Sequence, residues 1–343
     1  MFLRTIKHAI APIAAAALSA ILLASPAHAA NTGLYGSTDP SSDAVYRQSL
    51  AILGLQAAGI RPAPTAIRWL VDQQCSDGSF QSYRADTSAP CAASDPQAFT
   101  GPDTNSTALA ALALYAVGEE RAAARAGDAL VRGTKRTGNL AAWPYNFGGT
   151  PDASSTGLVV NALAAIDGNS QVVEAGQRWL RARIIPCART YGGALRNDAT
   201  SKAANNFATA QGLIGLTEAL PVDEQDDTGA NPSCAGSPVQ RVSSYLARTL
   251  TRDGILTYSG FGGNDYGSTA AAVIALGDAE LGSGGIDAAV TALKRDARTW
   301  IATESGDSVG AAGWLLMVAT STGENPRSFG GVNLVQTITG SIR

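Results

Sequence analysis

Two kinds of hydrophobic segment alternate along the chain. Segments of the first kind are almost uniformly apolar and rich in alanine, leucine and valine, as expected of helices buried on all sides. One octet from each of these segments aligns with the others, and its second residue is always small enough to let a neighbouring helix approach closely. The octets recur roughly 40 to 60 residues apart as QSLAILGL (48–55), TALAALAL (107–114), TGLVVNAL (156–163), TAQGLIGL (209–216), TAAAVIAL (269–276) and AAGWLLMV (311–318).

Segments of the second kind lie between the octets and carry apolar residues on one helical face only. They span residues 64–74, 119–135, 170–184, 237–251 and 285–304. Paired segments of the two kinds predict an all-α fold, an (α/α)6 toroid of about twelve helices in an inner and an outer ring. We favour a ring because helices that are apolar all round need cover on two faces, and neither end of the array carries the polar cap of an open solenoid. We expect a single toroid domain over residues 43–343, preceded by a flexible lead-in over residues 30–42.

The first 29 residues have the pattern of a secretory signal peptide. Arg4 and Lys7 precede an apolar run over residues 9–24, and Ala27-His28-Ala29 fits a small-residue cleavage site. No later stretch is long and apolar enough to span a bilayer. We therefore expect a secreted, extracellular protein with no integral membrane segment after signal removal. A protein or glycan on a cell surface is one candidate partner.

Charge and histidine content exclude several classes of function. The chain has 25 basic and 28 acidic residues, so it offers no net positive field for nucleic acid. Its only two histidines, His8 and His28, lie within the expected signal peptide. The mature chain then cannot build a Ser-His-Asp or Cys-His catalytic device, and zinc loses its usual nitrogen ligand. We expect no metal site and no cofactor.

Four cysteines follow the signal peptide, and an even number in an exported protein predicts two disulfides. Cys75 and Cys91 bracket one loop and form the first expected pair. Cys187 and Cys234 form the second pair by elimination. The sequence has no Cys-x-x-Cys motif, which would indicate a redox role.

The segment WLVDQQCSDGSF (69–80) is similar to the repeat loop of the terpenoid cyclase and protein prenyltransferase superfamily, and RTGNLAAW (136–143), RTYGGAL (189–195) and TRDGILTY (251–258) are weaker copies. The resemblance implies the same toroid. Class II cyclases carry a D-x-D-D-T-A motif whose middle aspartate protonates the substrate. The matching residues 103–108 have Asn105 at that position, and an amide cannot act as this acid. The zinc site of prenyltransferases requires a histidine.

The secreted cobalamin carriers are a third branch that this sequence resembles. Their inner helices begin with segments similar to the motif D-x-x-S-T-G, and residues 152–157 and 265–270 match that pattern. The resemblance implies a disulfide-bonded toroid without catalysis, with cobalamin as a candidate ligand.

In a toroid, the loops that precede the inner helices gather at one end of the central cavity. Here these loops end in Asp or Asn, which are good helix N-caps and keep spare lone pairs for a ligand. The loops also carry aromatic residues that suit a flat ligand or a sugar. Trp314 replaces a small residue in its octet and either plugs the centre or stacks on a ligand. The candidate ligand-binding residues are Asp103, Asn105, Trp143, Tyr145, Asp152, Tyr191, Tyr258, Asp265, Tyr266 and Trp314.

We interpret the chain as a non-catalytic toroid that binds a small molecule or a glycan. The alternatives are a divergent terpenoid cyclase that uses Asp103 or Asp152 as its acid, an (α/α)6 carbohydrate-active enzyme with paired carboxylates, and a structural protein with a filled centre. A carboxylate of raised pKa that faces aromatic rings would favour the cyclase.

Overall fold

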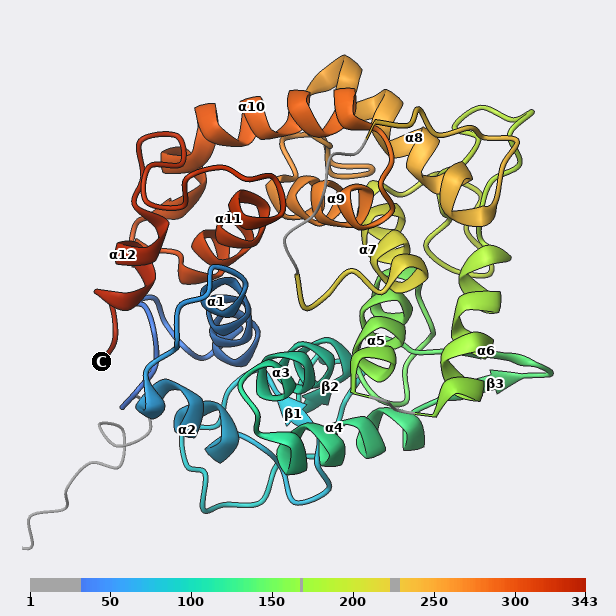
Figure 1. Cartoon of the computed structure of the whole chain (residues 1–343). Coiled ribbons are helices and arrows are strands. Elements are labelled where there is room, and N and C mark those ends of the chain that lie inside the picture. Colours follow the sequence, from blue (N-terminus) through green and yellow to red (C-terminus); the bar gives the residue numbers. More distant parts are fainter. Residues whose placement is uncertain (1–31, 167–168, 223–228) are drawn as a thin grey trace, which may run out of the picture.

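The computed structural model describes residues 32–166, 169–222 and 229–343, and the expected signal peptide lies outside these residues. Helices of the described part form two concentric rings, so the predicted all-α toroid is confirmed (Figure 1). The inner helices are α1 (Ala44–Ala57), α3 (Thr104–Ala116), α5 (Ala153–Ala165), α7 (Asn206–Thr217), α9 (Tyr266–Asp278) and α11 (Val309–Ser321). The outer helices are α2 (Pro64–Asp72), α4 (Glu120–Arg132), α6 (Ser170–Arg181), α8 (Pro238–Asp253), α10 (Ser283–Ile301) and α12 (Leu334–Thr339).

Three short antiparallel ladders lie in the loops between the helices. They pair β1 (Phe80–Gln81) with β2 (Pro102–Asp103), β3 (Lys135–Thr137) with β4 (Leu140–Ala142), and β5 (Ala302–Thr303) with β6 (Gly306–Asp307). Within the described ranges, no helix is long and apolar enough to cross a membrane.

The ring closes between its first and last inner helices. Each inner helix packs against the next, and α1 packs against α11. Glycine makes this contact close, because a Cβ atom on Gly313 would lie only 2.4 Å from the carbonyl oxygen of Leu50. The two ends of the described chain also meet, since the Gly33 amide donates to the Arg343 carbonyl (2.8 Å) and the Arg343 amide donates to the Leu34 carbonyl (3.1 Å). The molecule is therefore a closed toroid and not an open solenoid.

The lead-in expected to be flexible is packed in its described part, residues 32–42. Leu34 and Tyr35 are each only 1 % exposed. The Tyr35 amide donates to Gln48 Oε1 (2.9 Å), and its hydroxyl accepts a hydrogen bond from the Ala63 amide (2.9 Å). This difference has a physical reason: the two apolar side chains belong to the hydrophobic core, so the segment is held by burial.

A threonine at the first octet position ties each of four inner helices to the loop before it. Thr107, Thr156, Thr209 and Thr269 each accept a hydrogen bond through Oγ1, at 2.9–3.0 Å, from the buried amide of an upstream loop residue. Three of these hydroxyls also donate to the carbonyl of the helix N-cap residue. The loops are thus fixed directly above the N-terminal ends of the inner helices.

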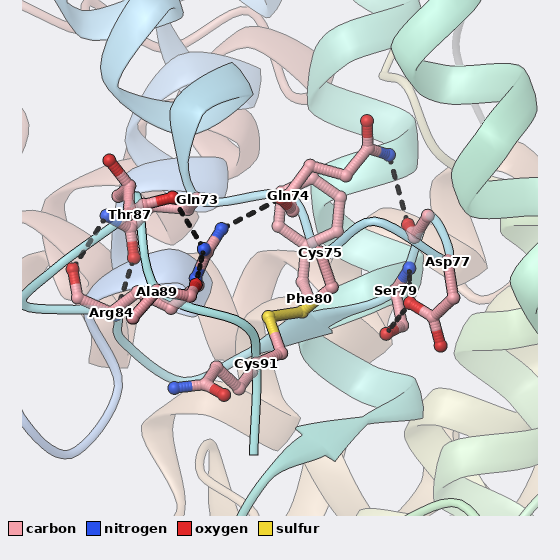
Figure 2. Close-up of a disulfide and its surroundings, with 12 residues drawn as sticks. Gln73, Gln74, Cys75, Asp77, Ser79, Phe80, Arg84, Thr87, Ala89 and Cys91 are labelled. Carbon is pink, nitrogen blue, oxygen red and sulfur yellow. Dashed lines mark hydrogen bonds between the residues drawn. A yellow bond between two sulfur atoms is a disulfide. The ribbon is translucent and has the colours of Figure 1, made fainter. Parts of the chain in front are cut away.

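Both expected disulfides are present, Cys75–Cys91 and Cys187–Cys234. Figure 2 shows the first of them beside Arg84, whose guanidinium donates to the carbonyls of Gln74 (2.9 Å) and Ala89 (2.6 Å). The disulfide and the arginine therefore hold together the two sides of the long loop after α2.

Candidate functional site

The N-terminal ends of α1, α3, α5 and α7 surround an open cavity of about 950 Å³, which we call the mouth cavity. Each of these helices contributes the residue two positions before its octet. These residues are Tyr46, Asn105, Ser154 and Phe207. The repeat register therefore decides which side chain of each inner helix faces the cavity.

Loops complete the wall of the mouth cavity, mainly with polar groups. The loop between β4 and α5 supplies Tyr145, Asn146 and Asp152, and the loop before α7 supplies Asn197 and Asp198. Among the described residues, lysine and arginine do not contribute to this wall. Asn146 Oδ1 is buried without a hydrogen-bond partner in the described part of the chain, so a donor on a bound ligand would satisfy it.

The predicted N-caps form at four of the inner helices. Asp103 Oδ1 accepts from the Ser106 amide (2.7 Å), Asp152 Oδ1 from the Ser155 amide (2.8 Å), and Asn205 Oδ1 from the Ala208 amide (2.9 Å). Asp265 caps α9 in the same way.

Hydroxyl groups also hold the Asp152 carboxylate. The Ser154 hydroxyl donates to its Oδ1 (2.6 Å) and the Ser155 hydroxyl donates to its Oδ2 (2.9 Å). Both oxygens of this carboxylate are thus already engaged within the protein.

Burial raises the pKa of the carboxyl groups at these caps. The pKa of Asp103 rises to about 6, because its carboxyl lies in the protein interior and the hydrogen bonds from Ser106 offset only part of the desolvation. The pKa values of Asp152 and Asp265 are raised for the same reason. Burial also raises the pKa of Tyr145 to about 12, and the nearby Asp103 charge adds to this increase.

Three aromatic rings stand at the rim of the mouth cavity. Phe99 is 72 % exposed, Tyr145 40 % and Phe207 38 %. The rings of Phe99 and Tyr145 are tilted by 54° at a centroid distance of 6.3 Å. Exposed ring faces next to hydrogen-bonding groups are suited to a ligand with one apolar and one polar side.

The structure separates the other predicted ligand-binding residues from this cavity. Trp143 is completely buried, and its indole Nε1 donates to the Leu130 carbonyl (2.7 Å), so it anchors the loop and does not face a ligand. Trp314 is 4 % exposed and packs within the core. Tyr266 stacks on Trp300 with a centroid distance of 5.5 Å.

Tyr191 and Tyr258 line a second cavity, with a volume of about 1160 Å³. The predicted set thus divides between two cavities and the protein interior. Asn105, Tyr145 and Asp152 share the mouth cavity, and Asp103 lies behind its wall.

Tyr46 and Phe207 are functional candidates that the sequence reading missed. Extending the octet alignment by two residues would have found them, because both occupy the same position relative to their octets as Asn105. Within the described residues, no group of three or more His, Cys, Asp or Glu side chains could hold a metal ion.

Comparisons with known proteins reveal likeness only among solved structures. No protein-family model and no curated protein sequence matches the chain. The ent-copalyl diphosphate synthase from Streptomyces platensis is 16 % identical, with a TM-score of 0.51; the match covers 82 % of this chain and 50 % of that one, so it spans about half the length of the synthase. The type II terpene cyclase MstE from Scytonema is 12 % identical, with a TM-score of 0.52; the match covers 87 % of this chain and 95 % of that one.

The fold is a terpenoid cyclase-like α/α toroid. This finding confirms the toroid fold that the resemblance of the repeat loops implied. At these identities the likeness extends to the arrangement of helices and not to the chemistry of the cavity. A variant of MstE is 12 % identical to this chain, with a TM-score of 0.50 over 86 % of this chain and 95 % of that one, and holds geranylgeranyl dihydroxybenzoate as its substrate.

Proposed function

We propose that this toroid binds a polyhydroxylated small molecule or a short glycan in its mouth cavity without converting it chemically. The observation that carries the proposal is the composition of the wall, where amides, hydroxyls and carboxylates alternate with a few exposed aromatic rings. Such a wall pairs with hydroxyl groups on a sugar, while a ring face covers the apolar C–H face of the same sugar.

The volume and openness of the mouth cavity suit a ligand of several sugar units. About 950 Å³ lies at the upper end of the range for small-molecule sites. A hydrocarbon substrate such as a terpenoid precursor would leave the buried Asn146 Oδ1 without a hydrogen-bond partner, which costs ~1–3 kcal/mol for such a group. The polar wall therefore favours a glycan over an isoprenoid.

The hydrogen bonds of the carboxylates support binding rather than catalysis. Asp152 already accepts three hydrogen bonds as the N-cap of α5, and its orientation is fixed by them. The position of the cyclase proton donor is occupied by Asn105, which cannot supply a proton as an acid. The hydrogen bonds of Asp152 and the amide of Asn105 argue against a pair of residues in the wall that act as general acid and general base.

Acid catalysis by Asp103 is a second candidate function, favoured by one observation. The raised pKa of about 6 leaves this carboxyl partly protonated in mildly acidic medium. Turnover of a bound ligand that disappears in Asp103→Asn would support this candidate. Asparagine can accept the same capping hydrogen bond, as Asn205 does at the start of α7.

We also propose that the protein acts outside the cell. Its two disulfides support this, because such bonds persist in oxidising compartments. A ligand displayed on a cell surface would then be accessible to the open cavity.

Isothermal titration calorimetry with neutral trisaccharides tests the proposed function. Maltotriose, cellotriose and mannotriose serve as probes. Hydroxocobalamin is titrated as well, because the sequence resembles the secreted cobalamin carriers. We expect one trisaccharide to bind, and Tyr145→Ala or Phe207→Ala to weaken binding about five- to tenfold, since one stacked ring contributes ~1 kcal/mol.

Phe261→Ala is the matched control. Phe261 is 94 % exposed and is not part of the wall of the mouth cavity, so its removal should leave the affinity unchanged. Binding of hydroxocobalamin alone, equal loss in all three variants, or chemical conversion of the bound trisaccharide would contradict the proposal.

A further inference from the structure

The second cavity, which we call the basic cavity, lies against the C-terminal half of α8. Its wall is formed by the loops over residues 185–204 and 257–262 together with that helix. Four cationic side chains contribute to this wall, namely Arg189, Arg196, Lys202 and Arg252. Among the described residues of the wall, the only carboxylate is Asp253, which pairs with Arg252 at 2.6 Å. Three positive charges therefore face the cavity without a carboxylate from the described wall.

Arg196 provides the main argument for an anion site. Its Nε is buried and has no hydrogen-bond partner among the described residues, and the same is true of Arg183 Nε. The two arginines are neighbours, because the Arg196 amide donates to the Arg183 carbonyl (3.1 Å). Arg183 lies over the Trp179 ring at 4.1 Å. Burial, followed by the charge of Arg196, lowers the pKa of Arg183, and the charge of Asp198 offsets part of this decrease.

Aromatic side chains accompany these charges at the rim of the basic cavity. Tyr191 is 60 % exposed and Tyr258 50 %. Cations placed next to open ring faces fit a sugar that carries an acidic group.

The first turn of α7 is the partition between the two cavities. Asn205 and Phe207 line the mouth cavity, and the residue between them, Asn206, lines the basic cavity. Asn206 is held in place, since its Nδ2 donates to the Thr257 carbonyl (2.9 Å) and its Oδ1 accepts from the Tyr245 hydroxyl (2.8 Å). A chain-like ligand can therefore lie across α7 with units on both sides.

We propose that the basic cavity binds the anionic group of an acidic saccharide. The requirement for an anion follows from the arginines and the lysine of this wall alone. The choice of a saccharide rests on the function proposed for the adjoining mouth cavity. The acidic wall of the mouth cavity, with Asp43, Asp152 and Asp198, makes the two cavities complementary in charge: the acidic unit is directed to the basic side.

Trigalacturonate and its methyl ester form a matched pair of probes, because esterification removes the charge and keeps the sugar. We expect calorimetry to show at least tenfold tighter binding of the acid at low salt. Raising sodium chloride from about 50 to about 500 mM should weaken binding of the acid and leave the ester nearly unaffected. Arg196→Gln should weaken binding of the acid about tenfold and leave the ester unchanged. The matched control Arg121→Gln, at an exposed arginine on α4, should change neither affinity.

Equal affinity for acid and ester would overturn the proposal, as would an acid affinity that survives Arg196→Gln. Tighter binding of a single-stranded oligonucleotide than of trigalacturonate would overturn the choice of a saccharide. If Arg196→Gln does not fold, as judged by circular dichroism, Lys202→Gln at an exposed position provides the same comparison. Acid binding that depends on Arg196, together with no binding of any neutral trisaccharide, would refute the function proposed for the mouth cavity and retain the anion site.

Discussion

Replacing Asp103 with asparagine should stabilise the protein at neutral pH. Asp103 is 2 % exposed and caps α3 through Oδ1. The pKa of its carboxyl is about 6 in the folded protein, against 3.8 for an unperturbed group. A difference of about 2 pH units at about 1.36 kcal/mol per unit corresponds to a penalty of about 3 kcal/mol for ionising the buried carboxyl. The asparagine side chain would keep the capping acceptor and avoid the charge.

The difference in free energy of unfolding between Asp103→Asn and the parent should depend on pH in a defined direction. Below about pH 4, both folded and unfolded states carry a protonated Asp103, so the variant and the parent should have similar free energies of unfolding. Between about pH 4 and 6 the unfolded state ionises first, and the parent loses stability as the pH rises. Above about pH 6 the advantage of Asp103→Asn should level off at about 3 kcal/mol. Urea unfolding followed by circular dichroism at about pH 4, 5, 6 and 7.5 measures this curve.

Asp86→Asn is a control of opposite sign. Hydrogen bonds from Ser88 lower the pKa of Asp86, which is exposed, so its charge should be slightly favourable at neutral pH. A destabilisation by Asp103→Asn at about pH 7.5, or a difference that does not vary with pH, would refute the reasoning about burial.

Three further changes test the packing of the toroid. Thr209→Val removes the acceptor for a buried loop amide and should cost ~1–2 kcal/mol in urea unfolding; an unchanged midpoint would show that this hydrogen bond contributes nothing net. Gly157→Ala should cost ~3 kcal/mol or more, because its Cβ would lie 2.1 Å from a carbonyl oxygen of α7. Its control Gly267→Ala should be neutral or stabilising by up to ~1 kcal/mol, since its nearest neighbour lies at 3.8 Å; equal effects of the two would contradict the close-packing argument. Replacing both Cys187 and Cys234 with serine should lower the free energy of unfolding by ~4 kcal/mol, the loop-closure entropy for a separation of 47 residues, and a loss below ~1 kcal/mol would contradict this account.

The fold could be predicted from the sequence because the repeat determines which helices are fully buried and which are half-exposed. Each octet lies within an inner helix, and the amphipathic segments become the outer helices that cover them. The aspartate caps were also predictable, since a cap is a local interaction over three residues. The packed lead-in was less evident, because two apolar residues such as Leu34 and Tyr35 give no periodic pattern.

The candidate sites could be predicted only in part, because orientation and assembly are not local properties. Trp143 precedes a proline in a loop and looks exposed in sequence, but its indole turns inward to the Leu130 carbonyl. Three cations of the basic cavity, Arg189, Arg196 and Lys202, are spread along one loop, so no charged run marks them. The fold then brings Arg252 of α8 to the same wall.

The hydrogen bonds of Arg343 with Gly33 and Leu34 bring the two ends of the described chain together, so the ring has no fixed first repeat. A covalent linker of a few residues could join Gly33 and Arg343, and new termini could be opened at an exposed turn such as the one at Gly118 between α3 and α4, where nothing lies within 4 Å of an added Cβ. Such a circular permutant should keep the native shape while changing which helix pair emerges first during synthesis. The toroid is thus a scaffold whose entry point can be moved without rebuilding its binding surfaces.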